Sequence, residues 1–155
     1  MSGNSRNSIV LCRACSIIFC CLAIFSGCNR QSAQYQDAPM QDGRISIPLS
    51  QVNDGTVHFY TYRHSGKRIN FFVRTDGKGT ISSYFDACYT CYKKKKGYRQ
   101  EGEDIICNEC SMKFGLAEEK WSEKDGCNPI LLKSSREDNR LLIDTAVIER
   151  GAKLF

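Results

Sequence analysis

Two pairs of cysteines with the same internal spacing constrain this chain more than any other feature. Two residues separate Cys88 from Cys91, two separate Cys107 from Cys110, and fifteen lie between the pairs. The two-residue gap lets both sulfurs of a pair face one centre, and fifteen residues can form a hairpin that brings the second pair opposite the first. The spacing therefore predicts a four-thiolate metal site of zinc-ribbon type.

Cys127 is a fifth thiol in the same part of the chain, and a four-ligand site does not account for it. Tetrahedral sulfur suits zinc, iron-sulfur clusters and Cu(I), so the residues alone leave the metal open. A metal-free alternative is also open, because cysteines of exported proteins commonly form disulfides and a Cys-x-x-Cys pair can exchange thiols. The sequence favours a metal site, with Cys127 either a further ligand or a thiol close to it.

The beginning of the chain has the pattern of an export signal. An uncharged run, ACSIIFCCLAIF, ends at Phe25 and is followed by Ser-Gly and then Cys28. The run is shorter than the roughly 20 residues of a membrane-spanning helix. Small residues before a cysteine resemble a bacterial lipobox, in which the cysteine is acylated and becomes the first residue of the mature chain. We therefore expect residues 1–27 to be a lipoprotein signal peptide and Cys28 to be lipidated.

The alternative for this region is an uncleaved anchor helix that begins near Ile9, which would place Arg13 inside the membrane at a cost in free energy. In both cases we expect the chain to be tethered to a membrane, and acylation of Cys28 would make membrane lipid its partner. We expect the domain to lie in the bacterial cell envelope on the extracytoplasmic side, which is the periplasmic side in a Gram-negative bacterium. The signal contains four further cysteines that then act as small apolar residues: Cys12, Cys15, Cys20 and Cys21.

The rest of the chain predicts a linker and one small domain. Residues 28–43 lack apolar periodicity and are rich in Gln, Asp and Ser, so we expect a flexible linker. From residue 44 onward, β-branched and aromatic runs are separated by the turn sequences HSGK and DGKG. We expect residues 44–155 to form a mainly β domain (β-rich α+β) of antiparallel hairpins, with a zinc-ribbon-like cysteine-rich insert at 86–129.

Individual elements follow from the same patterns. The expected strands are 44–50, 56–63, 67–75, 80–85 and 141–144, with a short element around 146–149. The strand at 56–63 carries large side chains on both faces, which favours a position inside its sheet. Helical periodicity is weak, and only 112–121 has the pattern of a short helix.

A series of motifs in this domain resembles a known family. An F-D-A-C-x-x-C step, a Gly-Tyr pair, a second C-x-x-C step and a Gly-Cys-Asn-Pro close follow one another after VHFYTYR and INFFVRTDGKG. This order is similar to the family of FtrD-like membrane iron-sulfur proteins, and the likeness covers most of the domain. The matching residues are Phe85, Asp86, Ala87, Cys88, Cys91, Gly97, Tyr98, Cys107, Cys110, Cys127, Asn128 and Pro129. Asp125 stands where the family usually has glycine, a change expected to alter a turn and keep every ligand.

The resemblance implies an iron-sulfur cluster, electron transfer and a link to bacterial ferrous-iron uptake. Many family members carry several membrane spans before this domain, whereas a lipoprotein signal is expected here. Electron transfer through the bilayer would therefore need a membrane redox or iron-transport partner. Clusters are generally loaded in the cytoplasm, and the chain lacks the twin-arginine pair associated with export of folded proteins. Zinc, Cu(I) or mononuclear iron, acquired after export, are the alternatives.

Other functions have little support in the sequence. The net charge of +5 includes two arginines of the signal, and this mild excess does not favour nucleic acid as a partner. We find no Ser-His-Asp set, phosphate loop or paired carboxylates in a recognisable frame, so we expect no catalytic residues, and a stand-alone enzyme is the less favoured interpretation. Two alternatives to a redox role stay open: a partner-binding lipoprotein with a structural zinc-ribbon-like site, and a thiol-disulfide exchange protein.

Several residues around the cysteines have weaker predictions. His58 is a modest ligand candidate, and His64 is expected to be solvated in a turn. The Lys93–Lys96 run is expected to be a solvated loop beside the site, with contact to anionic lipid or an acidic partner as the alternative. The tyrosines that flank the cysteines are expected to shield the site: Tyr89, Tyr92 and Tyr98.

Overall fold

The computed structural model describes residues 33–121 and 127–155. The predicted signal peptide, the lipidation site Cys28 and Asp125 lie outside these ranges. The described residues belong to one unit of the chain and form three sheets, in which nearly all strand pairs are antiparallel. The predicted mainly β fold is therefore confirmed. None of the helices within the described ranges is long and apolar enough to cross a membrane.

The largest sheet has five strands in the order β1-β4-β5-β6-β10, and only β1 and β4 pair in parallel. Its strands are β1 (Tyr35–Asp37), β4 (His58–His64), β5 (Lys67–Thr75), β6 (Ile81–Cys88) and β10 (Pro129–Leu132). The strands expected at 56–63, 67–75 and 80–85 are confirmed by β4, β5 and β6. β4 lies between β1 and β5, inside the sheet as its two large-residue faces predicted.

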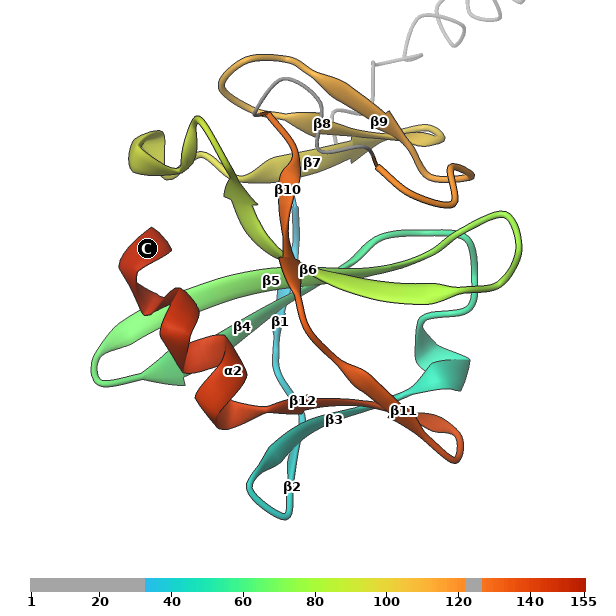
Figure 1. The fold of residues 1–155 in the computed structure, drawn as a ribbon, viewed down its shortest axis with the longest axis vertical. Helices are drawn as coiled ribbons and strands as arrows, with labels where there is room; N and C mark the ends of the chain where they lie inside the picture. Colours follow the sequence, from blue (N-terminus) through green and yellow to red (C-terminus); the bar gives the residue numbers. More distant parts are fainter. Residues whose placement is uncertain (1–32, 122–126) are drawn as a thin grey trace, which may run out of the picture. The chain divides into compact units, whose positions relative to one another are not determined.

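Two smaller sheets and a C-terminal helix complete the fold (Figure 1). The four-stranded sheet contains β2 (Met40–Gln41), β3 (Arg44–Pro48), β11 (Ser135–Glu137) and β12 (Arg140–Asp144). The three-stranded sheet contains β7 (Tyr98–Glu101), β8 (Asp104–Cys107) and β9 (Lys113–Gly115). Helix α2 (Thr145–Glu149) continues into a 3₁₀ segment at Arg150–Leu154, and shorter 3₁₀ turns occur at Leu49–Gln51 and Tyr92–Lys94.

The five-stranded sheet is buried on both faces, because successive side chains of a strand point to opposite sides. Phe71 belongs to a core that includes Ile47 of β3 and Ile148 of α2. Its neighbour Phe72 belongs to a second core, which includes Ile105 of β8. Figure 1 shows the five-stranded sheet between the other two. The cysteine-rich insert is therefore a layer of the same domain, packed on the central sheet.

Two sequence expectations about local structure are wrong. The predicted linker does not extend to residue 43, because Tyr35–Asp37 pairs with β4 and Met40–Gln41 pairs with β3. These short polar strands satisfy their backbone groups at sheet edges and need no apolar alternation to do so. The helix expected at 112–121 is also wrong, because Lys113–Gly115 forms a strand beside β8.

Arg74 supports the loop that follows β9. Its side chain is buried, and Nη1 donates hydrogen bonds to the carbonyl oxygens of Leu116 and Glu118 at 2.8 and 2.6 Å. The guanidinium also lies over the ring of Trp121, with 4.2 Å between Cζ and the ring centroid. These partners offset part of the cost of removing the cation from water. A long-range contact from the central sheet therefore fixes the backbone that the local sequence suggested would be helical.

We predict that Gly151→Ala destabilises the domain by about 1–3 kcal/mol, because a Cβ at this position would overlap the buried ring of Phe85. Alanine normally favours a helical segment over glycine, so the sign of the change tests the packing of the C-terminal segment on β6. Urea unfolding of the two proteins measures the difference. Phe85→Leu in the Gly151→Ala background should restore part of the lost stability, and an unchanged unfolding midpoint in the single variant would contradict this packing.

Candidate metal centre

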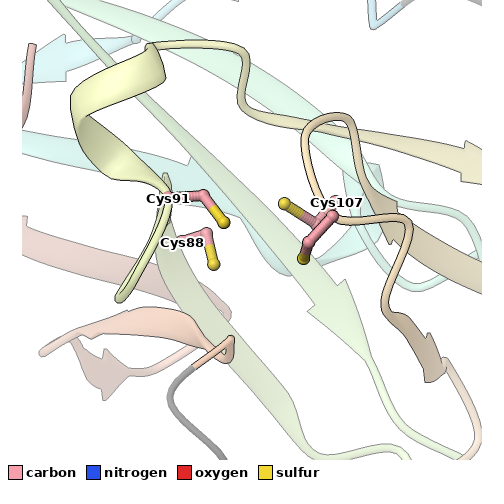
Figure 2. Close-up of side chains that lie close together, drawn as sticks. Cys88, Cys91 and Cys107 are labelled. Atoms are coloured by element: carbon pink, nitrogen blue, oxygen red, sulfur yellow. The ribbon is translucent and has the colours of Figure 1, made fainter.

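Four cysteine sulfurs converge at the ends of two strands. The Sγ atoms of Cys88, Cys91, Cys107 and Cys110 all lie within 4.8 Å of one another. Figure 2 shows Cys88 and Cys91 facing Cys107 across a short gap. β6 ends at Cys88 and β8 ends at Cys107, and the second cysteine of each pair lies in the turn that follows. The β7–β8 hairpin thus brings the two pairs together, as their spacing predicted.

The group has a buried side and an exposed side. Cys88 and Cys107 are only 3% and 1% exposed, and both belong to the core that joins the three-stranded and five-stranded sheets. Cys91 is partly buried, and Cys110 is exposed to solvent. The buried thiols are therefore held rigidly by packing, while the centre reaches the surface at Cys110.

Backbone amides donate hydrogen bonds to the sulfurs of the second pair. Burial raises the pKa of the Cys107 thiol to about 11, although the N–H groups of Cys110 and Glu109 donate to its sulfur and act in the opposite direction. At Cys110 burial also acts to raise the pKa, but the N–H of Met112 and the neighbouring thiols donate to its sulfur, and the pKa is lowered. Amides that point at sulfur stabilise negative charge there, as metal-binding thiolates require.

Cys127 lies beside this group but is not among the four mutually close sulfurs. Its thiol is hydrogen-bonded with those of Cys110 and Cys88, and the interaction with Cys110 is the main reason that the pKa of Cys127 is raised. β10 brings it there, because Pro129 pairs with Cys88. The carbonyl oxygen of Cys127 accepts hydrogen bonds from Cys88 Sγ at 3.2 Å and from the Tyr98 hydroxyl at 3.1 Å. Its role as a metal ligand stays a prediction.

Asp86 joins the strand that ends in the first cysteine pair to the hairpin that ends in the second. Its carboxylate is buried; Oδ1 accepts the backbone N–H of Tyr98 at 2.7 Å, and Oδ2 accepts the Tyr35 hydroxyl at 2.5 Å. Burial raises the pKa of Asp86 to about 6, and the two hydrogen bonds partly offset this effect. Gly97 has φ +61° and faces the carboxylate so closely that no Cβ fits between them.

The sequence did not assign this joining role. The F-D-A-C motif contained Asp86 as a matching residue, but nothing in its local context indicated Tyr35, which is 51 positions away. Tyr35 also lies in the segment expected to be a flexible linker. Only the parallel pairing of β1 with β4 brings its hydroxyl to the carboxylate.

Further contacts tie the two cysteine loops to each other. The backbone N–H of Asn108 donates to the carbonyl oxygen of Gly97 at 3.0 Å, and its side-chain amide donates to the carbonyl oxygen of Lys96 at 2.8 Å. The ammonium group of Lys96 forms an ion pair with Glu109 at 2.7 Å. Lys93–Lys95 are exposed, in agreement with a solvated loop beside the site.

The weaker predictions have mixed outcomes. His58 contacts Asp54, with 2.8 Å between Nε2 and Oδ1, and the structure does not place it with the four cysteines. His64 is partly exposed and lies 3.1 Å from Glu149. Tyr98 is fully buried next to Cys88 and Cys107, and so shields them. Tyr89 is 69% exposed, so its predicted shielding role is wrong.

Comparison with protein-family models shows to which family this domain is related. A family model described as "Membrane iron-sulfur containing protein FtrD-like" matches residues 52–155, a range that contains all five cysteines described above. The chain belongs to the FtrD-like family. The resemblance found in the sequence is therefore confirmed, and the family description associates this FtrD-like domain with membranes and with iron-sulfur chemistry. No curated protein matches the chain.

We predict that Gly97→Ala destabilises the FtrD-like domain by about 2 kcal/mol more than Gly102→Ala does. Both glycines have positive φ, so both variants are strained, but only a Cβ at residue 97 would also overlap the Asp86 carboxylate. Denaturant unfolding gives the free energy of unfolding of each variant. The difference between the two separates backbone strain, which both share, from the overlap with Asp86, which only the Gly97 variant has. Equal losses of stability would show that the contact between Gly97 and Asp86 contributes nothing.

Proposed function

We propose that this chain is a membrane-anchored, extracytoplasmic metal-binding protein that acts as a redox component linked to iron transport. The observation that carries the proposal is the convergence of Cys88, Cys91, Cys107 and Cys110 in an FtrD-like domain. Four thiol ligands at this spacing are typical of tetrahedral sites for zinc or iron. The family description supports iron and a membrane setting.

The residues around the sulfurs suit a centre that exchanges electrons without rearranging. Cys88 and Cys107 are fixed in the core, so their positions need not change with the charge of the centre. The N–H groups that donate to Cys107 and Cys110 stabilise negative charge on these two sulfurs. They would thereby tune the reduction potential of the metal centre. Cys110 is exposed, so the centre is accessible from solvent at this residue. A partner that approaches this side would reach the centre without opening the fold.

Membrane attachment belongs to the same proposal. Lipid acylation at Cys28 would anchor the chain at the outer side of the cytoplasmic membrane or elsewhere in the cell envelope, and a membrane redox or iron-transport protein would be its partner. The lipobox pattern and the family's association with membranes support this arrangement. The two or three acyl chains of a lipidated cysteine give stable attachment to a membrane, whereas one acyl chain alone gives only marginal attachment.

One specific observation favours a second candidate, thiol-disulfide exchange. The exposed Cys110 is hydrogen-bonded with the thiol of Cys127, so the two sulfurs are close enough to react after a small movement. This candidate requires metal-free thiols that are alkylated rapidly. A structural zinc site, the third candidate, requires bound zinc that shows no reduction potential. Redox titration and alkylation of the purified chain, before and after addition of a chelator, separate the three.

We predict that Cys110→Ser lowers the bound metal per chain at least about tenfold, whereas Cys127→Ser leaves it within about twofold of the unchanged protein. The two thiols are neighbours, but only Cys110 belongs to the four mutually close sulfurs. Elemental analysis of protein purified without oxygen measures the ratio. The same metal content in both variants and the parent would refute a four-cysteine centre, and equal loss in both would make Cys127 a ligand.

The membrane anchor is tested separately. Cys28→Ser should prevent incorporation of labelled fatty acid and move the chain from the membrane fraction to the soluble fraction, because the acyl chains are the proposed attachment. Cys21→Ser is the matched control, since this cysteine belongs to the predicted signal and should have no effect. A Cys28→Ser chain that stays in the membrane without fatty acid would indicate an uncleaved anchor helix.

A further inference from the structure

The spacing of the four sulfurs distinguishes one metal ion from a cluster of several. Four thiolates around a single zinc or iron ion form a tetrahedron with edges of roughly 3.8 Å, given metal–sulfur bonds of about 2.3 Å. In a four-iron cluster each thiolate binds a different iron, so the cysteine sulfurs lie roughly 6 Å apart. In this chain no pair among the four exceeds 4.8 Å. The sulfurs are already too close together to surround a four-iron cluster.

A two-iron cluster is excluded by the distances between the pairs. Such a cluster binds two thiolates on each iron, and the sulfurs on different irons are separated by the whole cluster. Cys88 and Cys91 would then lie far from Cys107 and Cys110. The structure shows the opposite, because distances between the pairs are covered by the same 4.8 Å limit as distances within them.

The fold resists the expansion that a cluster would need. Cys88 and Cys107 are packed in the core, so moving them apart would disturb the contact between two sheets. The cysteine loops are also joined by Asn108, which donates hydrogen bonds to the carbonyl groups of Gly97 and Lys96. The ion pair between Lys96 and Glu109 adds a third connection. Expansion would break these bonds, whereas closing around one ion needs a movement of less than about 1 Å per pair of sulfurs.

The space beside the sulfurs is also small. The cleft lined by Cys88, Cys91 and Cys107 has a volume of about 60 Å³, which is room for a few water molecules. Leu154 and Phe155 are among the other residues that line this cleft. This cleft therefore offers little free room beside the sulfurs for additional irons and bridging sulfides.

We infer that Cys88, Cys91, Cys107 and Cys110 bind a single tetrahedral iron or zinc ion, with Cys127 outside the coordination sphere and no inorganic sulfide at the centre. A single iron held by four cysteine thiolates agrees with the iron-sulfur description of the family, because all its sulfur then comes from the protein. The inference rests on the proposed function only in that the centre binds metal. It also removes the need to load a cluster before export, because one ion can bind after the chain has crossed the membrane.

The test uses the full chain extracted without oxygen from its own membranes, so that the metal is the one acquired in the cell envelope. Elemental analysis gives iron and zinc per chain, and acid-labile sulfide is measured on the same sample. X-ray absorption at the metal edge then shows whether a second metal lies near the first. We expect one ion per chain, no labile sulfide, and a shell of sulfur neighbours without metal–metal scattering. The Cys127→Ser chain should give the same spectrum.

The outcomes separate this inference from the proposed function. One sulfide-free iron supports both, and one zinc supports the single-ion site but contradicts a redox role. Labile sulfide in amounts similar to iron, with iron–iron scattering, overturns the inference and leaves the redox function standing. A chain without metal overturns both. A spectrum that loses one sulfur neighbour in Cys127→Ser would also overturn the inference, because Cys127 would then be a ligand.

Discussion

The burial of the central sheet on both faces is the constraint on which the rest of the structure depends. Phe71 and Phe72 point to opposite sides of β5, so each side needs its own apolar cover. The four-stranded sheet and α2 provide one cover, and the three-stranded sheet provides the other. Small cysteine-rich segments rarely bury enough apolar surface to fold alone. Here the cysteine-rich segment packs against the aromatic face of the five-stranded sheet. Cys88 and Cys107 belong to the core between them.

Hydrogen bonds between the two cysteine loops are a second constraint on the site. Each loop is short and follows a strand end, so its position depends on the strand that carries it. Asp86 of β6 links this strand to the β7–β8 hairpin by accepting the N–H of Tyr98, and Asn108 adds a link at the loops themselves. Hydrogen bonds to buried or charged acceptors are among the stronger contacts available to a chain. These contacts hold the two cysteine pairs close to each other.

Local patterns in the sequence predicted much of this fold, and the failures share one cause. The repeated cysteine spacing and the aromatic, β-branched runs contain their own signal, so the site, β4, β5 and β6 were predictable. Tyr35 and Met40 lie in short strands whose only support is a neighbour far along the chain. The backbone after β9 is held by Arg74 from the central sheet, and Cys127 is placed by β10. Contacts of this kind leave no periodicity in the sequence.

The early start of β1 shortens the connection between the domain and its proposed anchor. Six residues separate Cys28 from Tyr35. An extended chain covers at most about 3.6 Å per residue, so Cys28 and Tyr35 can be no more than about 25 Å apart. Tyr35 is itself hydrogen-bonded to Asp86, two residues before Cys88. A lipid at Cys28 would therefore confine the cysteine centre to a thin zone above the bilayer, where a partner embedded in the membrane has easier access than a protein diffusing in the surrounding fluid.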